Sequence, residues 1–185
     1  MDQFTSAERS RIEEAIRAKY AKVATSPEGK FRYPTGREGS EALRYDPQVI
    51  KLLPESAVAS YCGVGNPFSL GPIRKNASIL DVGCRGGVDT IIAAMLVGPE
   101  GRAMGVDPVP EMLERARRNL AKTGLTNVTF TEASGEALPF QDESFDVVLS
   151  NGAFNLIPDK TQALGEVFRV LKPGGRLMMA VRYSR

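Results

Sequence analysis

The sequence predicts an α/β fold with a doubly wound parallel sheet, and three observations carry that prediction. Residues 78–97 run from a short apolar strand through a glycine-rich turn into a helix, the unit that opens such folds. From residue 77 onward, apolar strand-like runs alternate with helix-like segments, as expected for a parallel sheet covered by helices. The first two strands end in aspartate, at Asp81 and Asp107. A ligand site is therefore expected at the carboxyl edge of the sheet.

Composition is typical of one soluble domain and excludes several classes of function. The chain has 185 residues, of which 42% are hydrophobic, and 24 basic residues nearly balance 22 acidic ones. Without a block of like charge or a long apolar run, neither nucleic acid nor a membrane is an expected partner. Two cysteines in dissimilar settings do not form a disulfide framework, so a reducing, cytoplasmic location is expected. Because the chain has no histidine, the commonest general base is absent, and we expect no metal site.

Two regions are expected: an N-terminal helical and loop extension over residues 1–70, and an α/β core over residues 71–185. The segment 25–40 is rich in proline and glycine and predicts a loop. Short helical pieces, interrupted at Pro54, are expected before a structured loop over residues 61–68. Such an extension either caps the ligand site or packs on the flank of the sheet.

The first helix is predicted from apolar residues that recur three and four positions apart over residues 6–24. Ser6 is the expected N-cap. Arg9 and Glu13 are expected to face water.

The strands and helices of the α/β core are predicted from the spacing of apolar residues and from turn signals. Gly124 marks the end of the second core helix, residues 134–140 read as a loop, and the run Lys172-Pro-Gly-Gly reads as a turn. In chain order the expected elements are strand 78–82, helix 87–97, strand 103–107, helix 110–123, strand 128–131, strand 145–150, helix 160–171 and strand 176–183.

The ends of the strands indicate a ligand that contains a nucleoside. An acid that closes the second strand, as Asp107 does, commonly accepts hydrogen bonds from a ribose diol. The dinucleotide pattern G-x-G-x-x-G, started at Gly83, would need glycine where the chain has Arg85 and Val88. A Walker-type phosphate loop is excluded because no Gly-Lys-Ser/Thr follows the turn.

Short motifs follow one another in a fixed order along the chain. They are Asp81-x-Gly83, Gly87-x-Asp89, Val106-Asp107, Leu138-Pro-Phe, Phe145-Asp146, Ser150-Asn151 and Leu171-Lys-Pro-Gly-Gly175. This ordered set resembles the class I S-adenosylmethionine-dependent methyltransferases, which have a Rossmann-like fold. Within that class the chain is similar to the arsenite methyltransferase branch, and the likeness covers nearly the whole sequence.

The resemblance implies S-adenosylmethionine as cofactor, S-adenosylhomocysteine as product, and a set of contacts. Gly83 and Gly87 would approach the methionyl part, Asp107 the ribose, and residues 134–136 the adenine. Asp81 would order the turn or meet the ammonium group. The implied cofactor-binding residues are Asp81, Gly83, Cys84, Arg85, Gly87, Asp107, Pro108, Met112, Ser134, Gly135, Glu136, Asn151 and Gly152. Ordinary structural roles also remain open, with Asp107 as a helix cap and the glycines as turn formers.

The chain departs from the family pattern at the cofactor turn. Arg85 stands at the middle glycine of the turn, where its guanidinium would either pair with the cofactor carboxylate or fill the pocket. Ser134 replaces an acid that often binds the adenine amino group.

The residues expected on the substrate side depart further from the pattern of the arsenite branch. Arsenic needs soft thiolate ligands, which cysteines supply. Val64 and Gly152 replace two cysteines of the arsenite branch, and the paired cysteines of the N-terminal loop are missing. Cys62 and Cys84 remain, and both read as small apolar residues. Arsenite is therefore not the expected acceptor.

The domain of the resembled family continues past its fifth strand, so the resemblance implies that the last strands are lacking and that Leu177 to Val181 would form an apolar sheet edge. A shortened chain, a homodimer and a separate partner chain remain open as explanations. The sequence predicts in-line methyl transfer to an unidentified small acceptor. If a base is needed, a carboxylate or one of Tyr20, Tyr33 and Tyr61 would serve. The alternative is an inactive relative that acts as a binding or assembly subunit.

Overall fold

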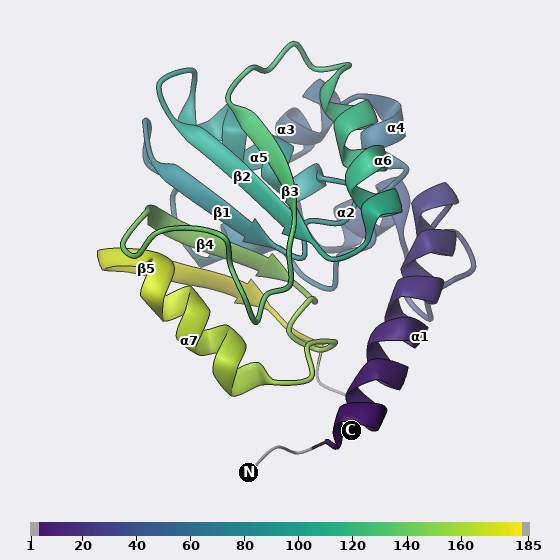
Figure 1. The fold of residues 1–185 in the computed structure, drawn as a ribbon. Helices are drawn as coiled ribbons and strands as arrows, with labels where there is room; N and C mark the ends of the chain where they lie inside the picture. The colour runs from purple at the N-terminus through teal and green to yellow at the C-terminus, as the bar shows by residue number, and fades with distance from the viewer. Residues whose placement is uncertain (1–3, 183–185) are drawn as a thin grey trace.

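A parallel sheet in the order β3-β2-β1-β4-β5 forms the centre of the molecule, which the computed structural model describes over residues 4–182 (Figure 1). The predicted doubly wound α/β fold is confirmed, with helices on both faces of the sheet. In chain order the elements are α1 (Ser6–Thr25), α2 (Gly36–Ala42), α3 (Pro47–Leu52), α4 (Glu55–Val58), the 3-10 helix η1 (Pro67–Leu70), β1 (Ser78–Val82), α5 (Val88–Val97), β2 (Arg102–Asp107), α6 (Pro110–Leu120), β3 (Val128–Glu132), β4 (Phe145–Asn151), α7 (Lys160–Val170) and β5 (Leu171–Ala180).

Alternating side chains of the central strands build two separate cores. On one face, Ile79 of β1 packs in a cluster with Ala93 of α5 and Ala116 of α6. On the other face, Leu80 packs in a cluster with Val167 of α7. Successive residues of a strand point to opposite faces, so the near-continuous apolar run of β1 serves both cores.

The first helix forms as predicted, but its cap is Thr5 and not Ser6. The Thr5 hydroxyl accepts a hydrogen bond from the backbone N–H of Glu8, and the Glu8 carboxylate accepts one from the backbone N–H of Thr5, a capping box. Tyr20 and Val23 of α1 pack with Met112 of α6, so the helix lies along one flank of the core (Figure 1). Within residues 4–182, no helix is long and apolar enough to cross a membrane.

The loop predicted over residues 25–40 is only partly a loop, because α2 begins at Gly36. The backbone N–H of Gly36 donates a 2.7 Å hydrogen bond to the carbonyl of Tyr61. This contact with a distant segment stabilises a helix that the local proline and glycine content does not favour. The predicted interruption at Pro54 is confirmed, since it separates α3 from α4.

The fifth strand begins earlier than predicted. Its register jumps from Phe145 opposite Leu171 to Val147 opposite Arg176, so residues 172–175 bulge out of the ladder where the turn was predicted. Within the described residues β5 pairs only with β4 and is an edge of the sheet. The predicted end of this strand at Tyr183 lies outside the described residues.

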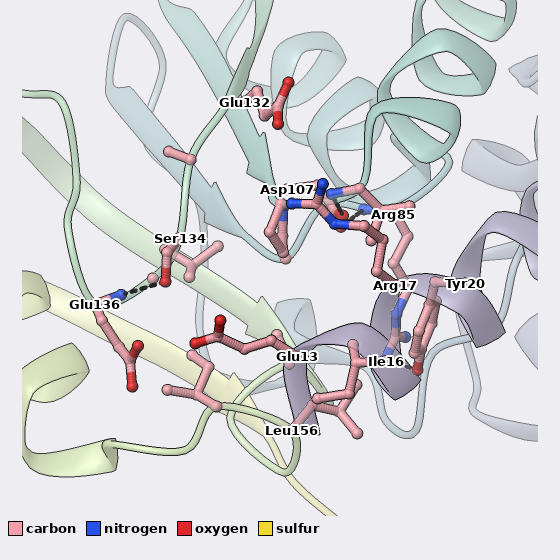
Figure 2. Close-up of a pocket in the computed structure, with 18 of the residues that line it drawn as sticks. Glu13, Ile16, Arg17, Tyr20, Arg85, Asp107, Glu132, Ser134, Glu136 and Leu156 are labelled. Carbon is pink, nitrogen blue, oxygen red and sulfur yellow. Dashed lines mark hydrogen bonds between the residues drawn. The ribbon is translucent and has the colours of Figure 1, made fainter. Parts of the chain in front are cut away.

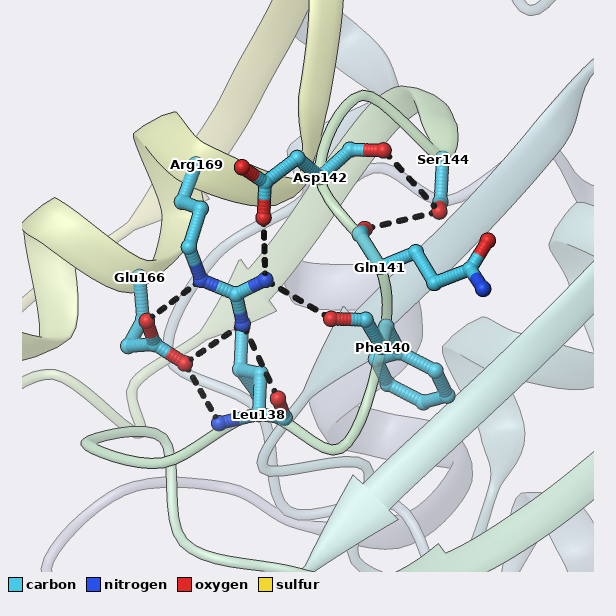
Figure 3. Close-up of polar contacts among 7 residues, drawn as sticks. All are labelled: Leu138, Phe140, Gln141, Asp142, Ser144, Glu166 and Arg169. Atoms are coloured by element: carbon cyan, nitrogen blue, oxygen red, sulfur yellow. Dashed lines mark hydrogen bonds and ion pairs between the residues drawn. The ribbon is translucent and has the colours of Figure 1, made fainter.

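Arg169 of α7 fixes the loop that follows β3 (Figure 3). Its guanidinium donates to the carbonyls of Leu138 and Phe140 at 3.0 and 2.7 Å, and it pairs with Glu166 and Asp142 at 2.7 and 2.8 Å. Glu166 in turn accepts a 2.8 Å hydrogen bond from the backbone N–H of Leu138. A planar guanidinium suits this fork of acceptors. The clamp orders the loop immediately after the segment that reaches the ligand cavity described next.

Candidate functional site

A cavity of about 560 Å³ opens at the carboxyl ends of β1, β2 and β3, and α1 forms its facing wall (Figure 2). The volume is within the range of small-molecule sites, and the lining combines apolar surface with a few charged groups. The lining residues are Glu13, Ile16, Arg17, Tyr20, Val82, Gly83, Arg85, Asp107, Pro108, Val109, Glu132, Ala133, Ser134, Gly135, Glu136, Ala153, Leu156, Ile157 and Pro158.

The glycine turn begins directly after β1. The backbone N–H groups of Gly83 and Cys84 donate to the carbonyl of Val106 at 2.8 and 2.9 Å, which ties the turn to β2. Gly83 has φ of 77°, and a Cβ atom there would overlap the side chain of Ala153. Only glycine combines this conformation with this close approach, so Gly83 lets the turn pack directly against Ala153 at the cavity wall.

Asp107 holds the turn in place from the end of β2. Its carboxylate accepts hydrogen bonds from the backbone N–H groups of Arg85 and Val109, at 2.9 and 3.0 Å. Burial raises the pKa of Asp107, and these two hydrogen bonds and the charge of Arg85 oppose the rise. Each oxygen has a second lone pair, so the carboxylate can still accept from a ligand hydroxyl in the cavity that it lines.

Arg85 adopts a left-handed backbone conformation, with φ of 51°. The residue is 8% exposed, and its guanidinium donates to the carbonyl of Cys62 at 2.7 Å and lies 5.4 Å from the ring centre of Tyr20. The side chain therefore crosses from the glycine turn to the N-terminal segment and forms part of the cavity wall.

The segment predicted to contact adenine lines the opposite side of the cavity, with Ser134, Gly135 and Glu136 all present. The Ser134 hydroxyl accepts a 3.2 Å hydrogen bond from the backbone N–H of Glu136 (Figure 2). The Glu136 carboxylate pairs with Arg9 at 3.1 Å and accepts from the backbone N–H of Asp159 at 2.6 Å. Glu136 thus fastens α1 and the start of α7 to the cavity rim. The prediction that Arg9 faces water is wrong.

Asp81 and Asn151 lie behind the turn and do not line this cavity. They border a much smaller space of about 20 Å³. Asp81 accepts a 2.7 Å hydrogen bond from the hydroxyl of Thr90, and burial, followed by the nearby charge of Asp89, raises the pKa of Asp81 to about 8. Asn151 donates to Asp89 and accepts from the backbone N–H groups of residues 64 and 65. Both side chains therefore support the turn and the loop before it.

The other predicted contacts outside the cavity are packing residues. The Cys84 side chain lies in the core beside Phe130, and burial raises the pKa of its thiol well above the ordinary value. Met112 packs against α1. A Cβ atom on Gly87 would meet Phe130 and Ala116, so this glycine allows helix and sheet to pack closely.

Gly152 stands beside the Arg85 guanidinium. A Cβ atom at Gly152 would lie 3.1 Å from Nη2 of Arg85 and 3.0 Å from the side chain of Val64. A side chain at position 152 would therefore crowd both Arg85 and Val64.

The cavity residues that sequence reasoning missed lie mainly on α1 and after β4. Glu13, Ile16, Arg17 and Tyr20 recur at three- and four-residue spacing and form one stripe along α1. The spacing could be read from the sequence, but the sequence did not show that this face of the helix borders the cavity. Glu132, at the end of β3, follows the same strand-end rule that identified Asp107 and could have been found by it.

Of the tyrosines named as candidate bases, Tyr20 and Tyr61 are buried and Tyr33 is half-buried. Burial raises the pKa of Tyr20, Tyr33 and Tyr61, and that of Tyr33 rises to about 12. A phenol with a raised pKa stays protonated near neutral pH and accepts a proton from a substrate poorly.

The fold and the site define a class of protein. It is an α/β domain with a ligand cavity between a glycine turn, an acid that ends the second strand, and a covering helix. A family model described as a methyltransferase domain matches residues 73–183. The chain belongs to this methyltransferase domain family, whose fold and members imply S-adenosylmethionine as cofactor.

Relatives and solved structures agree with this assignment and with the predicted resemblance. An arsenite methyltransferase from Halobacterium salinarum is 36% identical over an alignment of 181 residues that covers 90% of this chain and 46% of the relative. A ubiquinone/menaquinone biosynthesis C-methyltransferase from a Marinomonas species is 39% identical over 113 residues, 60% of this chain and 45% of the relative. The crystal structure of an arsenic(III) S-adenosylmethionine methyltransferase from Chlamydomonas reinhardtii matches with a TM-score of 0.59 and 33% identity, covering 78% of this chain and 48% of that one. The chain thus spans less than half of these relatives.

Proposed function

We propose that this chain binds S-adenosylmethionine in the cavity at the carboxyl edge of the sheet and transfers its methyl group to a small acceptor other than arsenite. The observation that carries the proposal is the position of buried Asp107, which borders a cavity of about 560 Å³ and holds the glycine turn by its backbone. Gly83 lets the turn pack against Ala153 at the cavity wall, and residues 134–136 line the far side of the cavity.

The residues present fit the cofactor in its nucleoside part. Asp107 would accept from the ribose hydroxyls, and apolar residues that include Val82, Val109 and Ile157 would bury the base. When bound, the cofactor supplies a methyl group activated by its sulfonium charge. The chain contributes binding, alignment and exclusion of water, which are the main requirements of an in-line transfer.

Arsenite is disfavoured as an acceptor by the thiols that the chain has. Cys62 and Cys84 are both buried, and burial raises the pKa of each thiol, so neither is available as a thiolate ligand. Within residues 4–182, no cluster of three histidine, cysteine or acidic side chains is placed to hold a metal ion.

Calorimetric titration with S-adenosylhomocysteine and S-adenosylmethionine tests the proposal directly. We expect dissociation constants in the micromolar range for both ligands, and competition by adenosine for the same site. An absence of binding at millimolar ligand would contradict the proposal. A positive result justifies a screen of thiols, amines and small acids as methyl acceptors, followed by detection of the demethylated cofactor.

A second candidate function, that of a binding or assembly subunit, is supported by a separate observation. Phe168 of α7 is 83% exposed and Leu164, one turn before it, is 43% exposed, on the helix that covers edge strand β5. A homodimer or partner chain along Leu177 to Val181 would pair that edge. Size-exclusion chromatography with light scattering distinguishes the cases, since a monomer at high micromolar concentration would contradict edge pairing.

A further inference from the structure

The Arg85 guanidinium is a buried cation that lacks an acidic partner in the described part of the chain. The residue is 8% exposed, yet no carboxylate of residues 4–182 lies within ion-pair distance of it. Its nearest polar contacts are the Cys62 carbonyl at 2.7 Å and the Tyr20 hydroxyl at 3.4 Å. Burying a charge is costly unless it is paired, and Asp107 acts on Arg85 electrostatically without pairing with it, so the guanidinium can still pair with an anion that enters the cavity.

The two side-chain and backbone groups that the guanidinium contacts carry no negative charge, and the carboxylate of Asp107 acts on it only from beyond ion-pair distance. Burial raises the pKa of the Tyr20 phenol and of the Cys62 thiol, so both remain neutral near pH 7. A guanidinium has five N–H donors, and only Nη1 and Nη2 have protein acceptors among the described residues. Donors therefore remain for a planar anion such as a carboxylate, which a guanidinium binds through paired hydrogen bonds.

Arg85 also stands at the correct end of the cavity for a ligand that carries both a ribose and an anion. Its backbone N–H donates to Asp107, the expected ribose acceptor, while its side chain lines the wall next to Tyr20 and Gly152. Arg85 thus contacts the expected ribose acceptor through its backbone, and its side chain places a positive charge on the adjoining wall of the cavity.

We propose that Arg85 binds the carboxylate of the nucleoside ligand and makes the cavity selective for ligands that carry this group. This inference rests on the proposed function, because it assigns one end of the same ligand. It predicts that the amino-acid part of the cofactor contributes strongly to affinity, through a residue that stands where the family has glycine.

Two ligands separate the contribution of the carboxylate from that of the nucleoside. S-adenosylhomocysteine carries the carboxylate, and 5′-methylthioadenosine has the same nucleoside and thioether without it. By calorimetry we expect the protein to bind S-adenosylhomocysteine at least tenfold more tightly. Arg85→Gln should lose about 10- to 100-fold in affinity for S-adenosylhomocysteine, the range of a charge-assisted hydrogen bond, and change less than threefold for 5′-methylthioadenosine.

Two further variants complete the test. Arg85→Lys keeps the charge and should retain more affinity for S-adenosylhomocysteine than Arg85→Gln does. Arg118→Gln removes an exposed arginine that pairs with Glu114 outside the cavity, and should leave both affinities unchanged. Unchanged binding of 5′-methylthioadenosine shows that each variant has folded.

The outcomes distinguish the inference from the function on which it rests. If the unmodified protein binds both ligands equally and Arg85→Gln changes neither affinity, the inference is wrong and the proposed function stands. If Arg85→Gly binds S-adenosylhomocysteine more tightly than the unmodified protein, the side chain fills ligand space and the inference is again wrong. If neither ligand binds at millimolar concentration, the proposed function fails and the inference fails with it.

Discussion

Asn151 donates a 2.9 Å hydrogen bond from Nδ2 to the Oδ2 atom of Asp89, and so joins the end of β4 to the first turn of α5. The same amide accepts from the backbone N–H groups of Val64 and Gly65, at 2.8 and 3.1 Å. Tyr45 donates to the other oxygen of Asp89 at 2.7 Å. The loop before the core, the sheet and the first core helix therefore share one buried polar network.

Asn151→Ala should lower the free energy of unfolding by about 2–4 kcal/mol, because it leaves two partly buried backbone N–H donors and one oxygen of buried Asp89 with fewer partners. Urea denaturation measures the change. Asn155→Ala, in which an exposed asparagine is removed, is the matched control and should cost less than about 1 kcal/mol. Equal stability of the two variants would mean that the network contributes little.

Asp107→Ala should weaken S-adenosylhomocysteine binding and also destabilise the turn. We expect a loss of about 2–5 kcal/mol in the free energy of unfolding, since the backbone N–H groups of Arg85 and Val109 lose their acceptor. Asp107→Asn keeps one acceptor oxygen, so it should be more stable than the alanine variant while still binding the ligand more weakly. Glu111→Gln, at an exposed site on α6, is the control. An unchanged dissociation constant in both Asp107 variants would remove the main support for the cofactor model.

Stability should fall as the pH rises, because of Asp81. Burial raises the pKa of Asp81 from 3.8 to about 8, so the folded state holds a proton that the unfolded state releases. Between these two values, stability declines with pH by up to about 1.4 kcal/mol per unit from this group. Thermal unfolding from pH 5 to 8 should therefore show a shallower decline in Asp81→Asn than in the unmodified protein. Parallel curves would show that Asp81 does not titrate in this window.

The N-terminal helix should respond to ligand, because four of its residues form a wall of the cavity. We propose that α1 caps the site, and expect S-adenosylhomocysteine to slow amide hydrogen exchange over residues 6–25. Arg9→Gln removes the 3.1 Å pair with Glu136 and should speed exchange of this helix by about two- to fivefold. Arg11→Gln changes an exposed arginine of the same helix and should have no effect. If the ligand binds without protecting α1, the helix packs on the flank and does not act as a cap.

The sequence predicted the core accurately where local pattern decides structure. The first strand was predicted at 78–82 and is observed at Ser78–Val82, because a buried parallel strand reads as a short apolar run ended by a turn. The helix at Gly36–Ala42 was missed because its support comes from a distant carbonyl, that of Tyr61. Asp107 was identified from local pattern as well, because it is the acidic residue that ends an apolar strand.

Side-chain direction limited the prediction of the site. Cys84 and Met112 were expected at the ligand and instead point into the packing of the core and of α1. Periodicity marked Ile16 and Tyr20 as one face of a helix, but the surface on which that face docks follows only from the arrangement of the whole chain.

The wall formed by α1 has a consequence for how the protein acquires its site during synthesis. Arg9 and Glu136, whose pairing fastens the helix, are 127 positions apart in the chain. The helix precedes the core elements in the chain, and the surface on which it docks is complete only when α6, the ends of β2 and β3 and the loop after β4 have formed. Such distant contacts form late because the intervening chain must first be ordered. The ligand cavity is therefore among the last features to form, and a bound ligand would stabilise the contacts that join α1 to the centre of the fold.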